Sequence, residues 1–480
     1  MVQPAPAPSE GAETKGRPGR QGKPAPAAAP SEESAQTAAL GARAVQLSEF
    51  YQGKVELIPK VPVRGLSDFS LYYTPGVAEV SRAIVAHPDA SFDLTGRGNT
   101  IAIVTDGSRV HGLGNIGPAA GMPVMEGKAL LFKYLGGVDA VPIPVDVPTP
   151  EALVELVRRI APAFGGINLE DIASPKCFFV LEELQKSLPI PVWHDDQLGT
   201  AAASTAGVVN ALELTDRKVG ELRTVLLGAG AANIATARLL LALGHDPRKL
   251  ALVDQKGILE PEREDLDELQ LHNPWKYRLA LQTHGGGRSG GLSEALRGAD
   301  LLIAASTPGP NVLSTDQIRS MADHPIVFAL ANPVPEIWPS AALEAGAAVV
   351  ATGRTDFPNP VNNSLIFPGV FRGVLDARAR KITDELVLAA VRELAARAHD
   401  RGLTREHLLP TMAETEVFPH VAAAVAEKAV QVGVARRQRT RSEFLAMARE
   451  RIQRSEDLAR LLVSSGMVAP MPPDPHQVPR

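Results

Sequence analysis

Two pairs of acidic residues follow apolar runs in this sequence. Glu170-Asp171 ends the run GGINLED, and Asp195-Asp196 ends the run IPVWHDD. Buried carboxylates this close together repel one another, so a folded chain must place positive charge between them. Mg²⁺ and Mn²⁺ prefer such oxygen ligands, and His194 is a further ligand or, more commonly, a hydrogen-bond partner of the acids. The pattern alone leaves a divalent metal site and two solvated strand ends as equal alternatives.

A glycine-rich loop stands between an apolar strand-like segment and a helix-like segment. In this context the first glycine forms a tight turn and the second lets a dinucleotide pyrophosphate reach the helix N-terminus. An acid at the end of the next strand accepts a hydrogen bond from the ribose. The predicted cofactor contacts are Gly228, Ala229, Gly230, Ala231, Ala232 and Asp254. The alternative is a glycine turn in an unrelated α/β domain.

Three residues near this loop bear on the choice of cofactor. Asn233 stands where a smaller residue is usual, and we expect it to push the helix slightly away from the strand. Asp254 would repel a 2′-phosphate and so favours NAD, whereas Lys256 would offset that repulsion. The prediction is NAD or NADP, with a small preference for NAD.

Three other polar residues lie near glycine or proline. Lys128, in MEGKALL, would act as a base if burial beside a metal lowered its pKa, or it is a lysine that extends from a helix start into solvent. Tyr73 precedes the turn Thr-Pro-Gly and is otherwise a tyrosine at an amphipathic rim. Arg109 lies in a glycine-rich loop, where it would clamp a carboxylate or form a surface salt bridge.

The elements that must position these residues indicate an α/β fold. Strands are predicted at 101–106, 140–146 and 189–195, with a helix that opens at Thr149-Pro150. Later apolar strands alternate with helical stretches, which indicates a parallel sheet covered on both faces, a doubly wound Rossmann-type domain. These strands are predicted at 223–230, 250–255, 299–306, 325–332 and 347–353. Beyond Thr383 the pattern is helical.

The predicted domain organisation has five parts. They are a disordered Pro/Ala-rich tail (1–40), an N-terminal α/β domain for substrate and metal (41–207), a Rossmann-type domain (208–380), C-terminal helices (381–470) and a flexible tail (471–480).

Composition excludes several classes of function. The chain has 480 residues, 45% hydrophobic and 21% charged, with a net charge of −5, which is ordinary for a soluble protein and gives no reason to expect a nucleic-acid partner. Its single cysteine, Cys177, suits a reducing compartment, and no apolar leader segment opens the sequence. We therefore expect a cytoplasmic protein without a membrane span.

Taken together, these residues resemble the malic enzyme family in its shorter bacterial form. The resemblance runs from about Val55 to about Arg380. It rests on the order and spacing of YTPGVAE, TDGSRVHGLGNIGP, PVMEGKALLFK, FGGINLEDI, HDDQLGTA, GAGAAN, FALANP and NPVNNSLIFPG. It implies the oxidative decarboxylation of (S)-malate to pyruvate and CO₂, with reduction of NAD(P)⁺ and a need for Mg²⁺ or Mn²⁺. A homodimer or higher homo-oligomer is implied by analogy.

The resemblance also implies a role for each motif residue. Lys128 matches the base that takes the proton of the malate C2 hydroxyl, Tyr73 the acid that completes enolpyruvate tautomerisation, and Asp195 the acid that supports the lysine. The implied metal ligands are Glu170, Asp171 and Asp196. The implied substrate contacts are Arg109, Asn332 and Asn363, and Asn332 and Asn362 also match contacts to the nicotinamide ribose.

Departures from the family pattern are few. Besides Asn233, Leu198 stands where relatives often have histidine and Ser81 where they often have cysteine, and neither belongs to the implied catalytic set. Two other functions remain open: a hydroxy-acid dehydrogenase that does not decarboxylate, and a catalytically silent regulator that binds nucleotide or metabolite.

Overall fold

The computed structural model describes residues 32–110 and 113–474, which divide into two compact units. The smaller unit contains the helix α1 (Glu32–Tyr51) and the segment 471–474. The two are in contact, and Arg43 donates a hydrogen bond to the Pro473 carbonyl at 3.0 Å. The tail that we predicted as disordered up to residue 40 therefore overlaps the start of α1, at residues 32–40. The predicted tails at 1–31 and 475–480 lie outside the described residues.

The larger unit, residues 53–470, begins with short helices and a four-stranded parallel sheet. The helices are α2 (Phe69–Tyr72), α3 (Val77–Ala86), α4 (Ser91–Leu94), α5 (Gly117–Gly136), α6 (Pro150–Ile160), α7 (Lys176–Ser187) and α8 (Thr200–Leu214). The strands are β1 (Thr100–Thr105), β2 (Asp139–Pro144), β3 (Gly166–Leu169) and β4 (Val192–His194). All three strands predicted here are present, and β3 lies in the apolar run before the first acidic pair.

The order of this sheet, β2-β1-β3-β4, brings the two acidic pairs together. The strands β3 and β4 are parallel neighbours, with Leu169 beside His194, so both pairs lie at the carboxyl edge of the sheet. The order reverses between β1 and β3, and a doubly wound sheet opens a crevice for ligands at such a point. The helix α6 begins as predicted, because the Thr149 hydroxyl accepts a hydrogen bond from the Ala152 amide at 3.1 Å.

A six-stranded sheet follows, in the order β10-β9-β8-β5-β6-β7. Its strands are β5 (Thr224–Leu227), β6 (Leu250–Asp254), β7 (Gly257–Ile258), β8 (Leu301–Ala304), β9 (Ile326–Ala329) and β10 (Val349–Thr352). Its helices are α9 (Ala231–Ala242), α10 (Leu266–His272), α11 (Pro274–Thr283), α12 (Leu292–Leu296), α13 (Thr315–Arg319) and α14 (Pro339–Glu344). The five predicted strands are parallel, and the unpredicted β7 adds an antiparallel edge. With β7 counted, the sheet has the Rossmann strand order 3-2-1-4-5-6.

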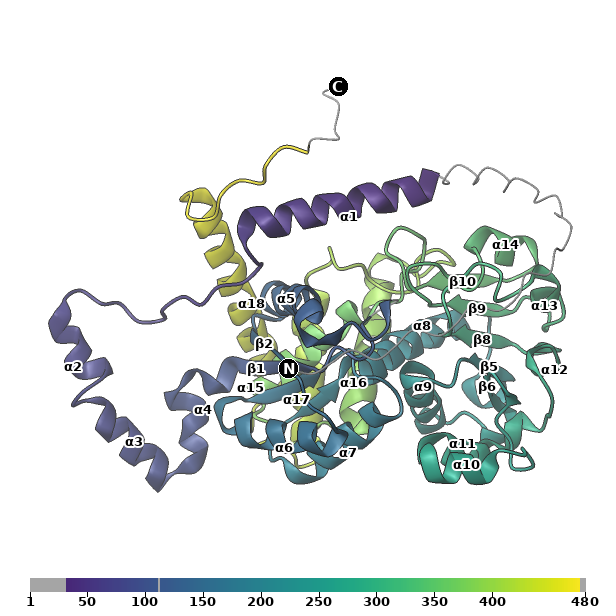
Figure 1. Cartoon of the computed structure of the whole chain (residues 1–480), viewed down its shortest axis with the longest axis horizontal. Coiled ribbons are helices and arrows are strands. Elements are labelled where there is room, and N and C mark those ends of the chain that lie inside the picture. Colours follow the sequence, from purple (N-terminus) through teal and green to yellow (C-terminus); the bar gives the residue numbers. More distant parts are fainter. Residues whose placement is uncertain (1–31, 111–112, 475–480) are drawn as a thin grey trace, which may run out of the picture. The chain divides into compact units, whose positions relative to one another are not determined.

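Helices cover both faces of this second sheet, as its continuous apolar strands predict (Figure 1). Along β5, Leu226 belongs to one buried cluster, and Val225 and Leu227 belong to another on the opposite face. The first cluster also includes residues of the four-stranded sheet and of the C-terminal helices, so one core connects the two sheets. The domain boundary predicted at residue 207 falls inside α8.

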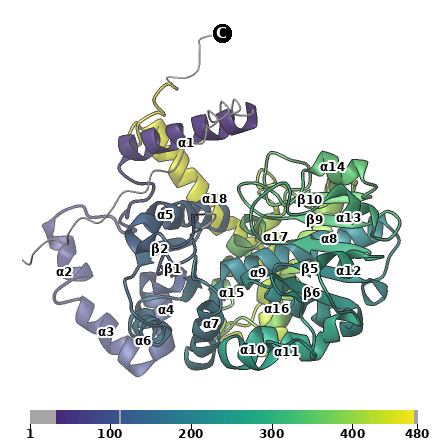
Figure 2. The same cartoon turned by 45° about the vertical axis from the view of Figure 1, so that its right-hand side comes forward.

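The chain ends in a group of packed helices. They are α15 (Phe367–Asp376), α16 (Asp384–Ala398), α17 (Val417–Gln431) and α18 (Arg441–Ser464). The helix α17 packs against α15, α16 and α18, and α18 also packs against α5, so the end of the chain returns to the first sheet. Figures 1 and 2 show α2 and α3 away from that sheet.

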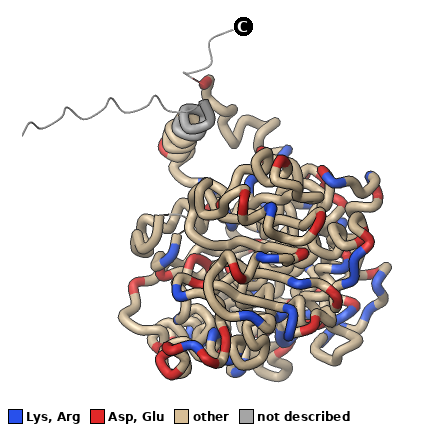
Figure 3. Tube along the Cα trace, turned by 90° about the vertical axis from the view of Figure 1, so that its right-hand side faces the viewer, with Lys and Arg blue, Asp and Glu red and all other residues tan. Residues whose placement is uncertain are grey.

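Acidic and basic residues are interspersed over the face formed by the second sheet and its helices (Figure 3). Within 32–110 and 113–474, every helix is too short or too polar to cross a bilayer.

Candidate active site

A buried lysine lies between two carboxylates at the carboxyl edge of the first sheet. Lys128, from the middle of α5, has its Nζ 2.5 Å from Asp195 Oδ2 and 2.9 Å from Glu170 Oε1. The lysine side chain is 8% exposed, and the two acids are almost fully buried. The sequence separates these residues widely, and the sheet order brings them together.

Neighbouring side chains hold both carboxylates in place. Asp195 Oδ1 accepts a hydrogen bond from Trp193 Nε1 at 2.9 Å, and Glu170 Oε2 accepts one from Asn168 Nδ2 at 2.8 Å. Because each acid uses its other oxygen for Lys128, its orientation is fixed from two sides. Sequence reasoning missed Trp193 and Asn168, although each lies two residues before the acid that it holds, on the same strand face.

The backbone at residue 199 passes so close to the Asp195 carboxylate that only glycine fits there. Asp195 opens a π-helical turn, Asp195–Gly199, between β4 and α8. A Cβ at Gly199 would lie 2.1 Å from Asp195 Oδ1 and 3.0 Å from Asn363 Cβ. Asn363, a predicted substrate contact, is therefore adjacent to the lysine cluster. Phe367 forms another wall, with its ring centre 4.3 Å from Lys128 Nζ.

The charge balance raises the pKa of Lys128, contrary to our expectation of a lowered value. Burial alone would lower this pKa, but Asp195 and Glu170 outweigh burial and stabilise the ammonium. The prediction assumed a metal beside the lysine, whereas in this arrangement the lysine itself neutralises the carboxylates. Burial raises the pKa of Glu170 well above its ordinary value, and Asp195 and Asp196 add to that effect although Lys128 opposes it.

The second acids of the two pairs are also neighbours. The Asp171 amide donates a hydrogen bond to Asp196 Oδ2 at 2.8 Å, and Asp171 has a left-handed backbone with φ 53°. A non-glycine residue in that region is uncommon and often lies at a functional site. The Arg109 amide donates to the Asp171 carbonyl at 3.0 Å, so the predicted arginine loop lies beside the acids, with its side chain exposed.

His194 is buried between these elements without a hydrogen bond from either ring nitrogen to a described residue. Its Nδ1 lies 3.8 Å from Asp196 Oδ2, which is too long for the expected hydrogen bond. Burial lowers the pKa of His194, although Asp196 and Asp195 oppose this, so the ring is buried in its neutral form.

The predicted metal ligands fit a divalent cation in chemistry but are not gathered around one point. Among the described residues, no three His, Cys, Asp or Glu side chains are arranged to hold a metal ion. The donors are nevertheless hard oxygen atoms, and the raised pKa of Glu170 reflects excess negative charge that a cation would offset. Binding would require Glu170 to exchange its contact with Lys128 for a metal.

At the second sheet, the glycine loop has the predicted form. Gly228 follows β5 with φ 92°, and a Cβ there would lie 2.5 Å from the Ala305 carbonyl after β8. The strand order reverses between β5 and β8, so the loop lies at the crevice where doubly wound sheets bind nucleotides. We expected Asn233 to push the helix away from the strand. Its side chain instead forms hydrogen bonds to the sheet: Nδ2 donates to the Leu227 and Ile303 carbonyls at 2.8 and 3.2 Å.

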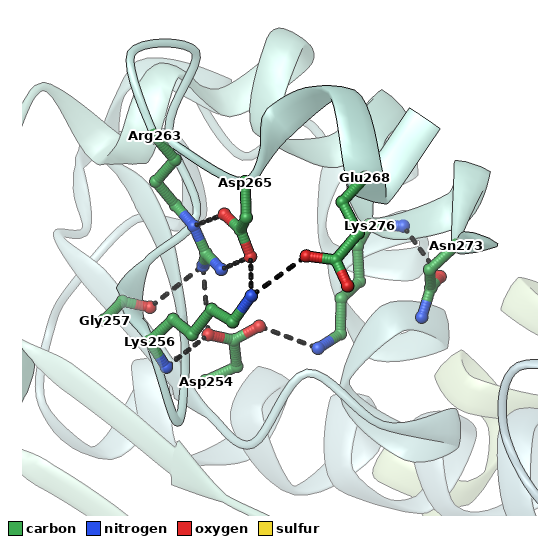
Figure 4. A network of polar contacts seen from close by, with 8 residues as sticks. All are labelled: Asp254, Lys256, Gly257, Arg263, Asp265, Glu268, Asn273 and Lys276. Atoms are coloured by element: carbon green, nitrogen blue, oxygen red, sulfur yellow. Dashed lines mark hydrogen bonds and ion pairs between the residues drawn. The ribbon is translucent and has the colours of Figure 1, made fainter. Parts of the chain in front are cut away.

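Asp254, at the end of β6, lies in a network of opposite charges (Figure 4). Its Oδ1 accepts from Arg263 Nη1 at 3.0 Å, and its Oδ2 accepts from Lys276 Nζ at 2.7 Å. Burial alone would raise the pKa of Asp254, but Lys276 and Arg263 hold it below its ordinary value. Lys256 points instead to Asp265 and Glu268, at 3.1 and 3.2 Å.

A buried glutamate positions two loops at the same edge of the second sheet. Glu336 Oε1 accepts from the Ser306 amide at 2.7 Å and from the Ser306 hydroxyl at 3.0 Å, and Oε2 accepts from the Ala331 amide at 3.1 Å. Ser306 follows β8, and Ala331 precedes the predicted contact Asn332, whose side chain is exposed. Sequence reasoning missed Glu336, because nothing in its proline-rich segment indicated burial.

Two other predicted residues, Asn362 and Tyr73, differ in their surroundings. The Asn362 side chain accepts from the Ser364 amide at 2.9 Å and begins the turn that includes Asn363. Tyr73 follows α2 with 70% of its surface exposed, and the structure does not bring it together with Lys128 in one chain.

Comparison with known proteins follows this division into two sheets. The sequence profile described as "Malic enzyme, N-terminal domain" matches residues 52–185, and "Malic enzyme, NAD binding domain" matches residues 198–430. The "NAD-dependent malic enzyme" of Geobacillus stearothermophilus is 46% identical over 385 residues, which cover 80% of this chain and 78% of that protein. The chain belongs to the malic enzyme family.

Other relatives extend this assignment within the malic enzyme family. The "NADP-dependent malic enzyme" of Halomonas elongata is 42% identical over 400 residues, with 80% of this chain and 92% of that protein covered. The crystal structure of the malic enzyme of Entamoeba histolytica is similar with a TM-score of 0.88 and 44% identity, over 94% of each chain. Relatives named for both cofactors leave the cofactor of this chain unassigned by similarity.

Proposed function

We propose that this malic enzyme family member catalyses the oxidative decarboxylation of (S)-malate to pyruvate and CO₂ with reduction of NAD(P)⁺. The observation that supports this most directly is the buried Lys128 between Asp195 and Glu170 at the carboxyl edge of the first sheet. The nucleotide loop at the switch point of the second sheet supplies the other half of the reaction. Family membership provides the substrate.

In the proposed mechanism, Lys128 takes the proton of the malate C2 hydroxyl. Asp195 orients the ammonium group, because Trp193 fixes its second oxygen. Lys128 must lose its own proton before this step, because the two carboxylates raise its pKa and so favour the ammonium form. Releasing Glu170 from the lysine would remove one of the two charges responsible.

The metal ligands that we propose are Glu170, Asp171 and Asp196. A bound Mg²⁺ or Mn²⁺ supplies Lewis-acid stabilisation of negative charge at the substrate oxygen, and a bound nicotinamide supplies the acceptor for the two electrons. Arg109 and Asn363 orient the malate, while Asn332 and Asn362 orient the nicotinamide ribose.

Product analysis tests the reaction against its alternatives. The full chain is supplied with malate, Mn²⁺ and NAD⁺ or NADP⁺, and pyruvate and CO₂ are measured with the reduced nucleotide. Equal amounts of all three are expected. Accumulation of oxaloacetate without CO₂ would indicate a non-decarboxylating dehydrogenase, and nucleotide binding without reduction would indicate a silent regulator.

For the cofactor, we propose a small preference for NAD, set by Asp254. Its negative charge faces the region of the ribose 2′-position, but Arg263 and Lys276 offset that charge, so discrimination against NADP is weak. Replacing Asp254 with Asn is expected to raise the ratio of kcat/KM for NADP⁺ over NAD⁺ by about tenfold. Asp316→Asn, at an exposed ion pair of α13, serves as the control. An unchanged ratio would remove Asp254 from cofactor choice.

We propose further that Tyr73 acts as the acid in the site of a second copy of this chain. Tyr73 is exposed, and apolar residues near it are exposed as well, including Leu57, Leu66 and Leu71. A second copy would cover this apolar segment and receive Tyr73 beside its Lys128. The homodimer that the family resemblance implies would then be required for activity.

Complementation between two inactive variants tests this arrangement. Chains with Lys128→Ala and chains with Tyr73→Phe are expressed separately and together. Each alone is expected to be inactive, whereas random pairing in an isologous dimer would restore about one quarter of the sites. Mixed dimers without activity would place Tyr73 in the site of its own chain or outside the mechanism.

A further inference from the structure

A strongly basic cavity lies at the opposite edge of the first sheet from Lys128. Its volume is about 300 Å³. Asn99 and Asp139, at the amino ends of β1 and β2, form part of its lining, whereas the lysine cluster lies at the carboxyl ends. Residues of α5 and α18 also line it. These two helices pack against each other (Figures 1 and 2).

Cations outnumber acids around this cavity. The basic residues that line it are Lys60, Lys133, Arg378, Arg437, Arg451 and Arg454. Against these six stand two carboxylates, Asp93 and Asp139, which leaves an excess of four positive charges. Only two lining residues, Phe92 and Leu375, have large apolar side chains, so an uncharged ligand would find little apolar surface.

The existing ion pairs do not satisfy this charge. Asp93 is shared by Arg378 and Arg437, and Asp139 is shared by Lys60 and Lys133. Each acid therefore faces two cations.

The remaining arginines are no better neutralised. Arg451 reaches Asp376 behind the cavity, at 3.4 Å, but that carboxylate is already paired with Arg372 at 2.8 Å. Arg454 has no hydrogen bond or ion pair with any residue that the structure describes.

The crowding has an electrostatic cost. Burial and the neighbouring charges of Arg437 and Arg451 lower the pKa of Arg378 to about 10. The Arg378 side chain is 13% exposed, so water relieves little of this repulsion. An anion in the cavity would stabilise all of these cations together.

We propose that this cavity is a binding site for a small polyanion that carries phosphoryl groups. Cations approach it from five separate segments: the loop at Lys60, α5, the segment after α15, the connection between α17 and α18, and α18. A tetrahedral phosphoryl group offers acceptor oxygens in several directions, whereas a carboxylate offers two in one plane. Guanidinium groups, which are four of the six cations, pair with phosphoryl oxygens in a bidentate manner.

Calorimetric titration of the full chain with sodium pyrophosphate tests the proposal. The buffer contains no divalent cation and has a fixed ionic strength. We expect saturable binding that Arg454→Glu weakens by about tenfold or more, because the reversed charge faces the ligand. Arg460→Glu, on the same helix outside the cavity, is the matched control and should bind as the unaltered chain does.

Three results would overturn the proposal. The first is no binding by the unaltered chain. The second is equal weakening by Arg454→Glu and Arg460→Glu, which would indicate a general charge effect. The third is binding that survives Arg454→Glu and is displaced by NAD⁺, which would place pyrophosphate at the nucleotide loop of Gly228.

A comparison with citrate tests the chemical class. Citrate has a similar charge on carboxylates, and we expect it to bind more weakly than pyrophosphate at equal ionic strength. Tighter binding of citrate, with the same loss in Arg454→Glu, would overturn the phosphoryl assignment.

Discussion

The carboxyl edges of the two parallel sheets use charge in opposite ways. At the first sheet, Lys128 and its two carboxylates are buried, and acids exceed cations. At the second sheet, Asp254 is paired with two cations in a network that extends to solvent. A buried excess of negative charge interacts strongly with a bound substrate or metal. A network of paired charges that reaches solvent changes the affinity for a ligand only slightly. The first arrangement suits chemistry, and the second suits recognition.

The largest expected effect comes from removing the lysine of the first edge. Lys128→Ala is expected to lower kcat for malate oxidation by about 10²- to 10⁴-fold, the usual contribution of a general base. NAD⁺ binding, measured by titration, should survive, because the nucleotide loop belongs to the other sheet. Unchanged turnover would contradict the assignment of the base and remove the contrast between the two edges.

Stability should next separate the buried ion pair of the first edge from an exposed ion pair. Asp195→Asn leaves Lys128 with one buried partner, and breaking a buried pair of this kind costs about 3–5 kcal/mol of unfolding free energy. The exposed pair of Arg159 and Glu155 on α6 is the control, where Glu155→Gln should cost under about 1 kcal/mol. Denaturant unfolding measures both, and similar losses would show that burial does not distinguish them.

A smaller effect is expected at the second edge, from Glu336. Glu336→Ala leaves two loop amides without an acceptor, at a cost of about 1–3 kcal/mol. Because one of these loops leads to the predicted cofactor contact Asn332, KM for the nucleotide should rise more than kcat falls. Glu336→Gln, which keeps an acceptor oxygen, should recover part of the affinity. Equal changes in KM for malate and nucleotide would argue for general unfolding instead.

The smallest effect is expected at the amino end of β5 in the second sheet, where His245 lies beside Thr224. Burial lowers the pKa of His245 below 6.5, although the Asp246 carbonyl opposes this, and its Nε2 lies 2.8 Å from the Thr224 hydroxyl. Below pH 6.5 the unfolded chain takes up the proton first, so stability is full above that value and falls as the pH falls. Melting temperatures of His245→Gln should therefore change less between pH 7.5 and pH 5.5 than those of the unaltered chain, since only His194 and other groups remain to titrate. Equal changes would show that His245 is not buried in its neutral form.

Much of the fold was predictable because it depends on local periodicity. The apolar runs of the second sheet predicted all five parallel strands, and the Thr149-Pro150 signal predicted the start of α6. The edge strand β7 has two residues, too few for a pattern, and the helical start at Glu32 lies in a segment whose composition resembles a tail. Short elements and boundaries depend on contacts that composition does not reveal.

The candidate site was predictable in its members but not in its contacts. Strand-end acids identified Glu170 and Asp195, yet nothing local indicated that Trp193 and Asn168 hold them. Asn233 was expected to disturb packing, and it instead bonds two strand carbonyls. Such partners come from elements whose pairing is set by the whole fold.

The sequence by itself determined which chemistry-bearing groups this protein has and at which strand ends they lie, because side-chain type and strand periodicity are local properties. Only the tertiary structure decided their charge states and partners. The pKa of Lys128 is raised rather than lowered because the order of the first sheet puts two carboxylates against one buried ammonium. The basic cavity likewise exists only because α18 returns to α5 across more than 300 residues of sequence. Electrostatic energy depends on distance and burial, and both arise from long-range packing.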